Sequence, residues 1–220
     1  YTCNLVKKII PTKKNITFVY PGAEDLRKEK SKNFIKIDGG PILITLARLE
    51  KRKGHSLIIN QIKKLITNFP KIRYIIAGEG PEMSNLKKLV KSSYLEKNVI
   101  FVGSIDNYQK KYLFENTDLM VMPTLNETHN NSIEGFGISY IEAAFFGIPS
   151  IASNIGGTPE AVLHNKTGII IKKQKELLPS LNKLLSDKKK LSLLGKNAKI
   201  RAVKEFTWKK VIKHYLDCIV

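Results

Sequence analysis

Six short apolar runs recur along the chain from residue 42 onward, and segments with a helical pattern separate them. The runs are almost continuously apolar, which is typical of strands buried on both faces of a sheet. They cover residues 42–47, 74–77, 99–102, 119–122, 150–152 and 168–171. Between them, apolar residues recur at helical spacing, as in residues 57–66 and 138–146. This alternation predicts an α/β fold with a Rossmann-like, doubly wound parallel sheet.

The two ends of the chain follow other patterns. Residues 16–20 predict one more short strand, which Pro21 and Gly22 close, and the charged residues 24–36 are typical of a linker. After residue 171, leucines at helical spacing predict that the rest of the chain is helical. We therefore expect a connecting segment, residues 1–36, and one globular domain, residues 37–220.

The carboxyl ends of parallel strands meet at one edge of a sheet, where ligands bind in open α/β folds. Glycine, proline or a charged residue follows most of the predicted strands, as at Arg48, Gly78, Gly103 and Pro123. This edge is therefore where the sequence predicts a ligand site.

The charge of the chain adds a second possibility. There are 38 Lys and Arg residues against 19 Asp and Glu, a net charge of +19, which fits a protein that binds nucleic acid or a membrane surface. However, 33 of the 38 are Lys and only 5 are Arg, and the planar guanidinium of Arg is favoured for phosphates and bases. We interpret the charge as a solvated Lys-rich surface, with contact to anionic lipid or an acidic substrate as the alternative.

The cysteines and the apolar runs limit the setting. Cys3 and Cys218 lie near opposite ends of the chain, without the spacing of a zinc site or a disulfide framework. No apolar run reaches the roughly 20 residues of a membrane span. We expect a reducing, cytoplasmic setting.

Residues 134–143 are the most informative segment. Glu134 and Glu142 are eight residues apart, and Gly135 and Gly137 follow the first of them. At the start of a helix, glycines let backbone N–H groups approach a phosphate, and a carboxylate two turns on can accept hydrogen bonds from two ribose hydroxyls. The alternative is structural: an acidic residue that the helix dipole favours, and a second on a solvated face.

Two further segments follow strands. Arg48 and Lys53 could hold a pyrophosphate, although a basic surface turn is the simpler alternative. Gly156 and Gly157 form a turn before a helix, which is a weak signal by itself.

Taken together and in this order, the segments resemble the donor-binding, C-terminal half of the retaining GT-B glycosyltransferases of glycosyltransferase family 4 (group 1). The resemblance covers about residues 15–220. It rests on Ala47-Arg48-Leu49 with Lys53-Gly54, Gly78-Glu79-Gly80-Pro81, Val102-Gly103, Pro123-Thr124, residues 134–143, Gly147-Ile148-Pro149, residues 156–160 and Thr167-Gly168.

The chain departs from the family pattern at two places. Ala47 stands where the family usually has glycine, and residues 125–133 form a longer, Asn-rich loop. His129 lies in that loop, and we expect it to be a solvated side chain. We also expect His55 to start a helix, and His164 and His214 to lie on the surface.

The resemblance implies three catalytic residues. Arg48 and Lys53 would hold the diphosphate of the donor and stabilise the departing charge, and Glu134 would contact the hydroxyls of the sugar.

The resemblance also implies residues that bind the donor without taking part in the chemistry. Backbone amides would meet the sugar or the phosphate, Glu142 the ribose, and the end of the third strand the base. These residues are Gly135, Phe136, Gly137, Glu142, Gly103, Ser104 and Ile105. The family is metal-independent, so no metal or other cofactor is expected, and none of the six Asp residues forms an Asp-x-Asp motif.

The resemblance implies transfer of a hexose, with retention, from a UDP- or GDP-linked sugar to a glycan or lipid-linked acceptor, for example in the synthesis of a cell-envelope polysaccharide. The acceptor would bind to an N-terminal half that this chain lacks, with residues 1–36 as the remnant of that half and the crossover linker. We therefore expect an inactive fragment whose partners are the nucleotide sugar, that half and the inner face of a membrane, but not nucleic acid. The alternatives are a sugar-nucleotide epimerase or phosphorylase of GT-B type, or a non-enzymatic basic module that binds nucleic acid or membrane. The spacing of Glu134 and Glu142 argues against the epimerase.

Overall fold

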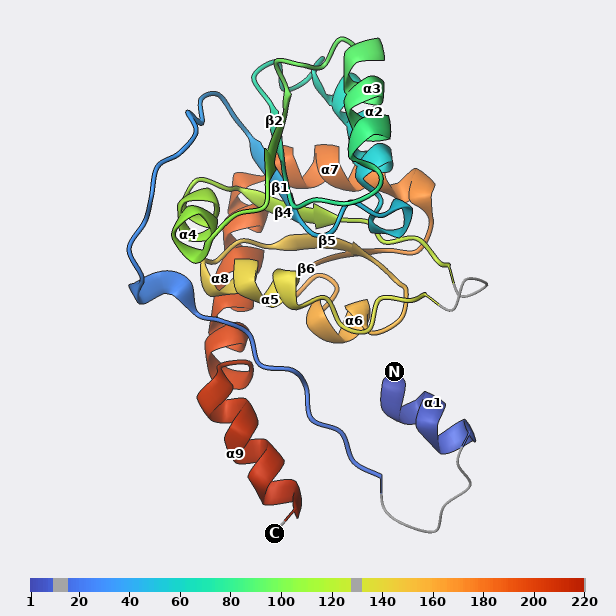
Figure 1. Ribbon diagram of the computed structural model, residues 1–220, viewed down its shortest axis with the longest axis vertical. Helices are drawn as coiled ribbons and strands as arrows, with labels where there is room; N and C mark the ends of the chain where they lie inside the picture. Colours follow the sequence, from blue (N-terminus) through green and yellow to red (C-terminus); the bar gives the residue numbers. More distant parts are fainter. Residues whose placement is uncertain (10–15, 128–131, 220) are drawn as a thin grey trace.

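A parallel sheet of six strands lies at the centre of the computed structural model, which describes residues 1–9, 16–127 and 132–219. The strand order is β3-β2-β1-β4-β5-β6 (Figure 1). The strands are β1 (Ile42–Leu46), β2 (Arg73–Ala77), β3 (Val99–Gly103), β4 (Leu119–Met122), β5 (Ser150–Ser153) and β6 (Gly168–Ile171). Every neighbouring pair is parallel. The predicted doubly wound parallel sheet is therefore confirmed.

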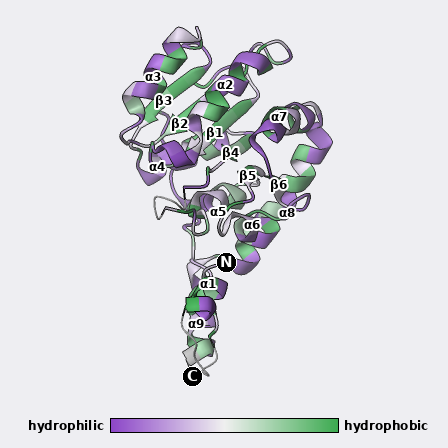
Figure 2. Cartoon of the chain, turned by 90° about the vertical axis from the view of Figure 1, so that its right-hand side faces the viewer, coloured by the Kyte–Doolittle hydropathy of each residue, from purple (hydrophilic) through white to green (hydrophobic). Residues whose placement is uncertain are grey.

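Helices cover both faces of this sheet. The α-helices are α1 (Thr2–Ile9), α2 (His55–Leu65), α3 (Met83–Ser92), α4 (Asn107–Glu115), α5 (Ile138–Phe145), α6 (Thr158–Ala161), α7 (Leu177–Ser186), α8 (Lys188–Glu205) and α9 (Trp208–Ile219), and the 3-10 turns are η1 (Leu26–Lys28), η2 (Lys51–Lys53) and η4 (Gln174–Glu176). Helices α4, α5 and α8 pack on the face to which Ile42 and Ile44 point, and α2, α3 and α7 on the face of Leu43. Most strand residues are apolar, with exceptions such as Thr45 and Ser150, because helices cover both faces of the sheet (Figure 2).

The direction of the strand order reverses between β1 and β4. β1 leads into α2 on one face of the sheet, and its neighbour β4 leads into α5 on the other. The two connections diverge at this point and leave a crevice at the carboxyl ends of the strands. Residues 47–54 thus come together there with residues 123–127 and 132–137.

The prediction of a strand over residues 16–20 is wrong. This segment pairs with no strand of the sheet, and extended backbone without a neighbour cannot form a ladder. Aromatic packing holds it instead, because the Tyr20 ring stacks on Phe136 at 5.1 Å between centroids and contacts Phe206 at 5.7 Å. An isolated β-bridge follows this segment and joins Ala23 to Thr207.

The segment predicted as a linker, residues 24–36, packs along α4. Leu26 in η1 is buried, Lys111 Nζ donates to the backbone oxygens of Arg27 and Glu29, and Tyr112 Oη donates to the backbone oxygen of Ile35. Although residues 24–36 are rich in charged side chains, they are therefore held firmly against the domain.

Helix α9 extends away from the body below α8 (Figure 1). Its side chains Trp208, Ile212, Tyr215 and Leu216 are about half exposed, whereas Val211 is buried. Within the described ranges, none of the helices has both the length and the apolar character that a bilayer-spanning segment needs.

Candidate functional site

The connection after β1 is fixed against the end of β4. Gly54 adopts φ +76°, and a Cβ there would lie 2.3 Å from the backbone oxygen of Pro123, so only glycine fits. Leu125 N donates to the backbone oxygen of Arg52 at 2.6 Å. These contacts hold the β1–α2 connection directly beside the chain that leaves β4.

A network of charged side chains joins the two connections. Lys53 Nζ lies 2.5 Å from Glu134 Oε2, and Arg52 Nη1 lies 3.1 Å from the same oxygen. Arg52 Nε contacts Glu50 Oε2 at 3.0 Å, and Arg48 Nη1 contacts Glu50 Oε1 at 3.1 Å. The sequence separates Lys53 from Glu134 by 81 positions, and the crevice brings them together.

Burial differs sharply within this network. The side chains of Lys53 and Glu134 are each 11% exposed, whereas that of Arg48 is 75% exposed. Three cations face two carboxylates, so one positive charge is in excess. A network with an exposed guanidinium and a surplus cation can accept an anionic group such as a phosphate.

The segment that carries Glu134 rests on the turn before α6. Cβ atoms at Gly156 and Gly157 would lie 2.1 Å and 1.9 Å from the backbone oxygens of Glu134 and Gly135. Gly157 N also donates to the Glu134 oxygen at 3.0 Å. The two glycines are a weak signal in the sequence, but their lack of a Cβ lets the turn before α6 lie directly against the backbone of residues 134 and 135.

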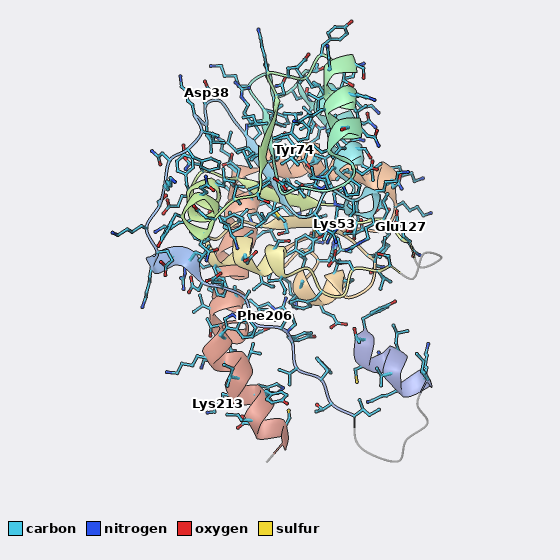
Figure 3. The ribbon with its side chains drawn as sticks, viewed as in Figure 1. Asp38, Lys53, Tyr74, Glu127, Phe206 and Lys213 are labelled. Atoms are coloured by element: carbon cyan, nitrogen blue, oxygen red, sulfur yellow. The ribbon has the colours of Figure 1, made fainter. Side chains whose placement is uncertain are left out.

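The three residues after Glu134 differ in exposure, because Gly135 is exposed whereas Phe136 and Gly137 are buried. Gly135 is exposed and a Cβ on it would meet nothing within 4 Å. The Phe136 side chain is buried against Tyr20 and Phe206, and Figure 3 labels Phe206 at the junction toward α9. Gly137 caps α5 with φ +89°. Of the three residues that follow Glu134, Gly135 is therefore the exposed one.

Glu142 forms a separate ion pair. Its Oε1 lies 2.7 Å from Lys110 Nζ of α4, and the two side chains are 12% and 15% exposed. The structure thus gives Glu142 a cationic partner from a different helix and does not place it in the ion-pair chain of Glu134.

The third predicted group lies at the edge of the sheet, where β3 ends. Gly103 accepts a backbone hydrogen bond from Gly78 N at 2.8 Å, Ser104 is exposed and Ile105 is partly buried. β2 and β1 separate β3 from β4, which corresponds to about 14 Å at the usual strand spacing. A ligand that contacts both residues 103–105 and the Glu134 segment must be as extended as a nucleoside diphosphate.

Buried polar side chains support the Arg48 turn from below. His55, which starts α2 as predicted, has Nδ1 3.2 Å from Tyr74 Oη and Nε2 3.4 Å from the backbone oxygen of Arg48. Tyr74 Oη in turn lies 2.8 Å from Thr45 Oγ1. Burial lowers the pKa of His55 to about 4, with a smaller contribution from Lys53, so the imidazole is neutral near pH 7. His55 is therefore a structural support.

Sequence reasoning missed Arg52, Glu50 and Lys110. Arg52 and Glu50 lie between two residues that were singled out, so a search for oppositely charged pairs near Arg48 and Lys53 could have found them. Lys110 belongs to a predicted helix, and nothing in the sequence links it to Glu142. His164 and His214 are exposed, as predicted, whereas His129 lies outside the described residues.

No group of three or more His, Cys, Asp or Glu side chains that could hold a metal ion occurs in the described part of the chain. The donor set at the crevice is cationic, with one surplus positive charge, and so suits an anion better than a metal cation.

Comparison with known families identifies this fold and crevice. The model of the family "Glycosyl transferases group 1" matches residues 27–201. The chain belongs to the group 1 glycosyl transferases. Residues 48–54, 134–142 and 156–157 all lie inside the matched range.

Curated relatives of this group 1 domain include enzymes that transfer different sugars. A GDP-mannose-dependent α-(1-6)-phosphatidylinositol monomannoside mannosyltransferase from Mycobacterium tuberculosis is 27% identical over 170 residues, which is 76% of this chain and 44% of that protein. The O-antigen biosynthesis glycosyltransferase WclY from Escherichia coli is 36% identical over 149 residues, or 65% of this chain and 38% of that protein. The chain thus spans less than half the length of these relatives.

Solved structures show the same fold. Sucrose-phosphate synthase from Thermosynechococcus elongatus matches 98% of this chain and 55% of its own with a TM-score of 0.78 at 22% identity. Anabaena HepE in complex with UDP and glucose matches 81% of this chain and 47% of its own with a TM-score of 0.71 at 22% identity. The C-terminal domain of a group 1 family protein (LpcC) from Francisella tularensis has a TM-score of 0.67 at 21% identity, with 86% of this chain and 96% of that one covered. These matches confirm the predicted Rossmann-like fold of a GT-B domain.

Proposed function

We propose that this group 1 domain is the donor-binding half of a retaining glycosyltransferase that moves a hexose from a UDP- or GDP-linked sugar to a glycan or lipid-linked acceptor. The observation that carries the proposal is the contact between Lys53 and Glu134 across the crevice, beside the exposed Arg48. A cation for the diphosphate and a carboxylate for the sugar are thus adjacent, as a nucleotide sugar requires. Anabaena HepE, whose structure contains UDP, supports a nucleotide-sugar ligand.

In this proposal Arg48 and Lys53 bind the diphosphate and stabilise the negative charge that develops as the nucleoside diphosphate departs. Glu134 accepts hydrogen bonds from the sugar hydroxyls and orients the anomeric carbon toward the acceptor. The exposed amide of Gly135 and those of Phe136 and Gly137 meet the sugar or the phosphate. Because the two cations supply the charge stabilisation, the reaction needs no metal ion.

The remainder of the nucleotide extends along the edge of the sheet. Glu142 accepts from the ribose hydroxyls, and Gly103, Ser104 and Ile105 at the end of β3 meet the base. The position of β3 at the edge of the sheet, two strands beyond β1, supports an extended ligand.

We also propose that catalysis needs a further, acceptor-binding half. The chain spans 44% of the mycobacterial mannosyltransferase, and it matches nearly all of a structure described as a C-terminal domain. Transfer requires donor and acceptor to be held together, so this chain alone binds donor weakly and does not transfer. A sugar-nucleotide epimerase or phosphorylase would share the donor site, and conversion of a UDP-sugar to its epimer by this chain would favour that alternative.

Calorimetric titration with UDP, GDP, UDP-glucose and GDP-mannose tests the proposal. We expect one of the two nucleotide classes to bind, and Lys53→Gln to weaken that binding at least tenfold, since a charge-assisted hydrogen bond is worth about 1.5–3 kcal/mol. Lys88→Gln, at an exposed position on α3, is the matched control and should leave binding unchanged. The proposal would be contradicted if none of the four ligands bound.

The proposed setting is the cytoplasm at the inner face of the membrane. On α9, helical spacing puts Lys209, Lys210 and Lys213 on one side and the half-exposed Trp208, Ile212 and Tyr215 on the other, an arrangement that suits anionic lipid. We expect sedimentation with phosphatidylcholine vesicles only when they contain anionic lipid. Equal binding without anionic lipid, or retained binding by Lys209→Glu/Lys213→Glu, would contradict this setting.

A further inference from the structure

Arg52 is the most constrained cation at the crevice. Its guanidinium bridges two carboxylates, with Nε 3.0 Å from Glu50 Oε2 and Nη1 3.1 Å from Glu134 Oε2. Its side chain is 19% exposed, and its backbone oxygen accepts from Leu125 N at 2.6 Å. Both the main chain and the side chain are therefore held, and the planar guanidinium has the geometry that a two-carboxylate bridge requires.

Lys53 is held by one side chain. Among the described residues, Glu134 is the only salt-bridge partner that the structure gives to its ammonium group. A diphosphate that draws Lys53 toward itself therefore competes with Glu134 for this ammonium group, which lies 2.5 Å from Oε2. A carboxylate that is only 11% exposed would then lose its closest counter-ion, which is costly unless a second cation stays in place.

We propose that Arg52 is a positioning residue that keeps Glu134 paired and oriented while Lys53 exchanges this carboxylate for the diphosphate of the donor. The inference rests on the proposed function, because it assigns the anion that Lys53 meets. Arg48 needs no such exchange, since its side chain is 75% exposed and contacts only Glu50 among the described salt bridges. Lys53 pairs with Glu134 in the structure, and Arg52 stays on this carboxylate when the diphosphate draws Lys53 away.

A double-mutant cycle on nucleotide affinity tests this role. UDP and GDP are titrated in turn into the unaltered protein, Arg52→Gln, Glu134→Gln and the double variant. We expect Arg52→Gln to weaken binding about tenfold, because Lys53 is then the only cation left for Glu134. In the Glu134→Gln background, the same change should have little effect, because no carboxylate holds Lys53. Arg52→Lys should fall between, since an ammonium group does not bridge two carboxylates as a guanidinium does.

Arg73→Gln is the matched control. The Arg73 side chain is also 19% exposed and also pairs with a carboxylate, that of Asp38 at 3.1 Å. However, Arg73 is the first residue of β2 and so lies at the amino ends of the strands, away from the crevice. Binding should be unchanged, and thermal unfolding confirms that each variant is folded. An unchanged affinity in Arg52→Gln, or an equal loss with and without Glu134, would overturn the inference and leave the proposed function intact. Failure of the unaltered protein to bind either nucleotide would overturn both.

Discussion

At the scale of single residues, the crevice combines flexible and fixed charges. Arg48 is largely exposed and Lys53 is nearly buried, although both stand in the same short turn of sequence. The difference arises because Lys53 points toward Glu134, whereas Arg48 leaves the turn toward solvent. Below them, the neutral His55 contacts the backbone of Arg48 and joins it to Tyr74 in the core.

The first prediction concerns the stability of this support at low pH. The pKa of His55 falls from its ordinary value of 6.5 to about 4 in the folded state, so between these values protons bind to the unfolded chain and favour it. His55 thus costs the protein no stability above pH 6.5, and up to about 3 kcal/mol of stability is lost as the pH falls toward 4.

Chemical denaturation from pH 7.5 to 4 measures this effect. The unaltered protein should lose more stability over that range than His55→Gln, in which the titrating group is absent and Tyr74 retains a hydrogen-bond partner. Identical pH profiles for the two proteins would show that burial does not hold His55 neutral.

The second prediction concerns Glu142. If its carboxylate holds the ribose, Glu142→Ala should weaken nucleoside diphosphate binding by about tenfold to a hundredfold. The variant should also lose the preference for a ribonucleotide over the 2′,3′-dideoxy analogue, which calorimetry measures directly. A preference that persists in Glu142→Ala would place the ribose elsewhere. Asp187→Ala, which removes the cap of α8, is the control for a general loss of stability.

At the scale of elements, the site depends on two loops that enter helices on opposite faces of the sheet. The β1 connection leads to α2 and the β4 connection to α5, and neither forms a site alone. The turn before α6 supports them, because Gly156 and Gly157 contact the backbone of residues 134 and 135. The Gly156-Gly157 turn between β5 and α6 therefore acts through packing, beneath the charged side chains of the crevice.

The third prediction tests this packing. A Cβ at Gly157 would lie 1.9 Å from the backbone oxygen of Gly135, so Gly157→Ala must displace the Glu134 segment and should cost about 1–3 kcal/mol of stability. Gly135→Ala is the matched comparison, because a Cβ there meets nothing within 4 Å, and its cost should stay below about 1 kcal/mol. Thermal unfolding of both variants decides the matter, and equal midpoints would contradict the proposed support.

At the scale of the whole molecule, the net charge of +19 does not define the function. The cations that the structure organises into the crevice are Arg48, Arg52 and Lys53, which face Glu50 and Glu134. Many other lysines are exposed on helices such as α3, α8 and α9. The membership in the group 1 glycosyl transferases rests on the match of the family model to residues 27–201.

The fourth prediction separates this charge from the donor site. A DNA duplex should bind only non-specifically, with a Kd of about 1–100 µM at physiological salt that weakens steeply as salt is added. Glu142→Ala should leave that weak binding unchanged while it reduces nucleotide affinity. Fluorescence anisotropy with labelled DNA measures the first quantity. Tight DNA binding that resists salt would instead favour a nucleic-acid-binding module.

Most of the fold followed from the pattern of apolar residues. The six buried strands and the helices between them are long enough, and regular enough, to be predicted from periodicity. Residues 16–20 were the exception, because a pattern of β-branched and aromatic residues reports extended backbone but not the presence of a neighbour with which to pair. The order of the strands was likewise beyond the sequence pattern, since adjacency is a property of packing.

The amino-acid sequence by itself determined the parallel α/β class, the edge on which a ligand site lies, and the residues Arg48, Lys53, Glu134 and Glu142 as candidates for it. Local periodicity and turn chemistry are sufficient for these, because they depend on neighbours in the chain. Only the tertiary structure decided that Arg52 bridges Glu50 and Glu134, and that Lys110 pairs with Glu142. Such contacts join side chains up to 82 positions apart, and the packing of the sheet and its helices brings them together.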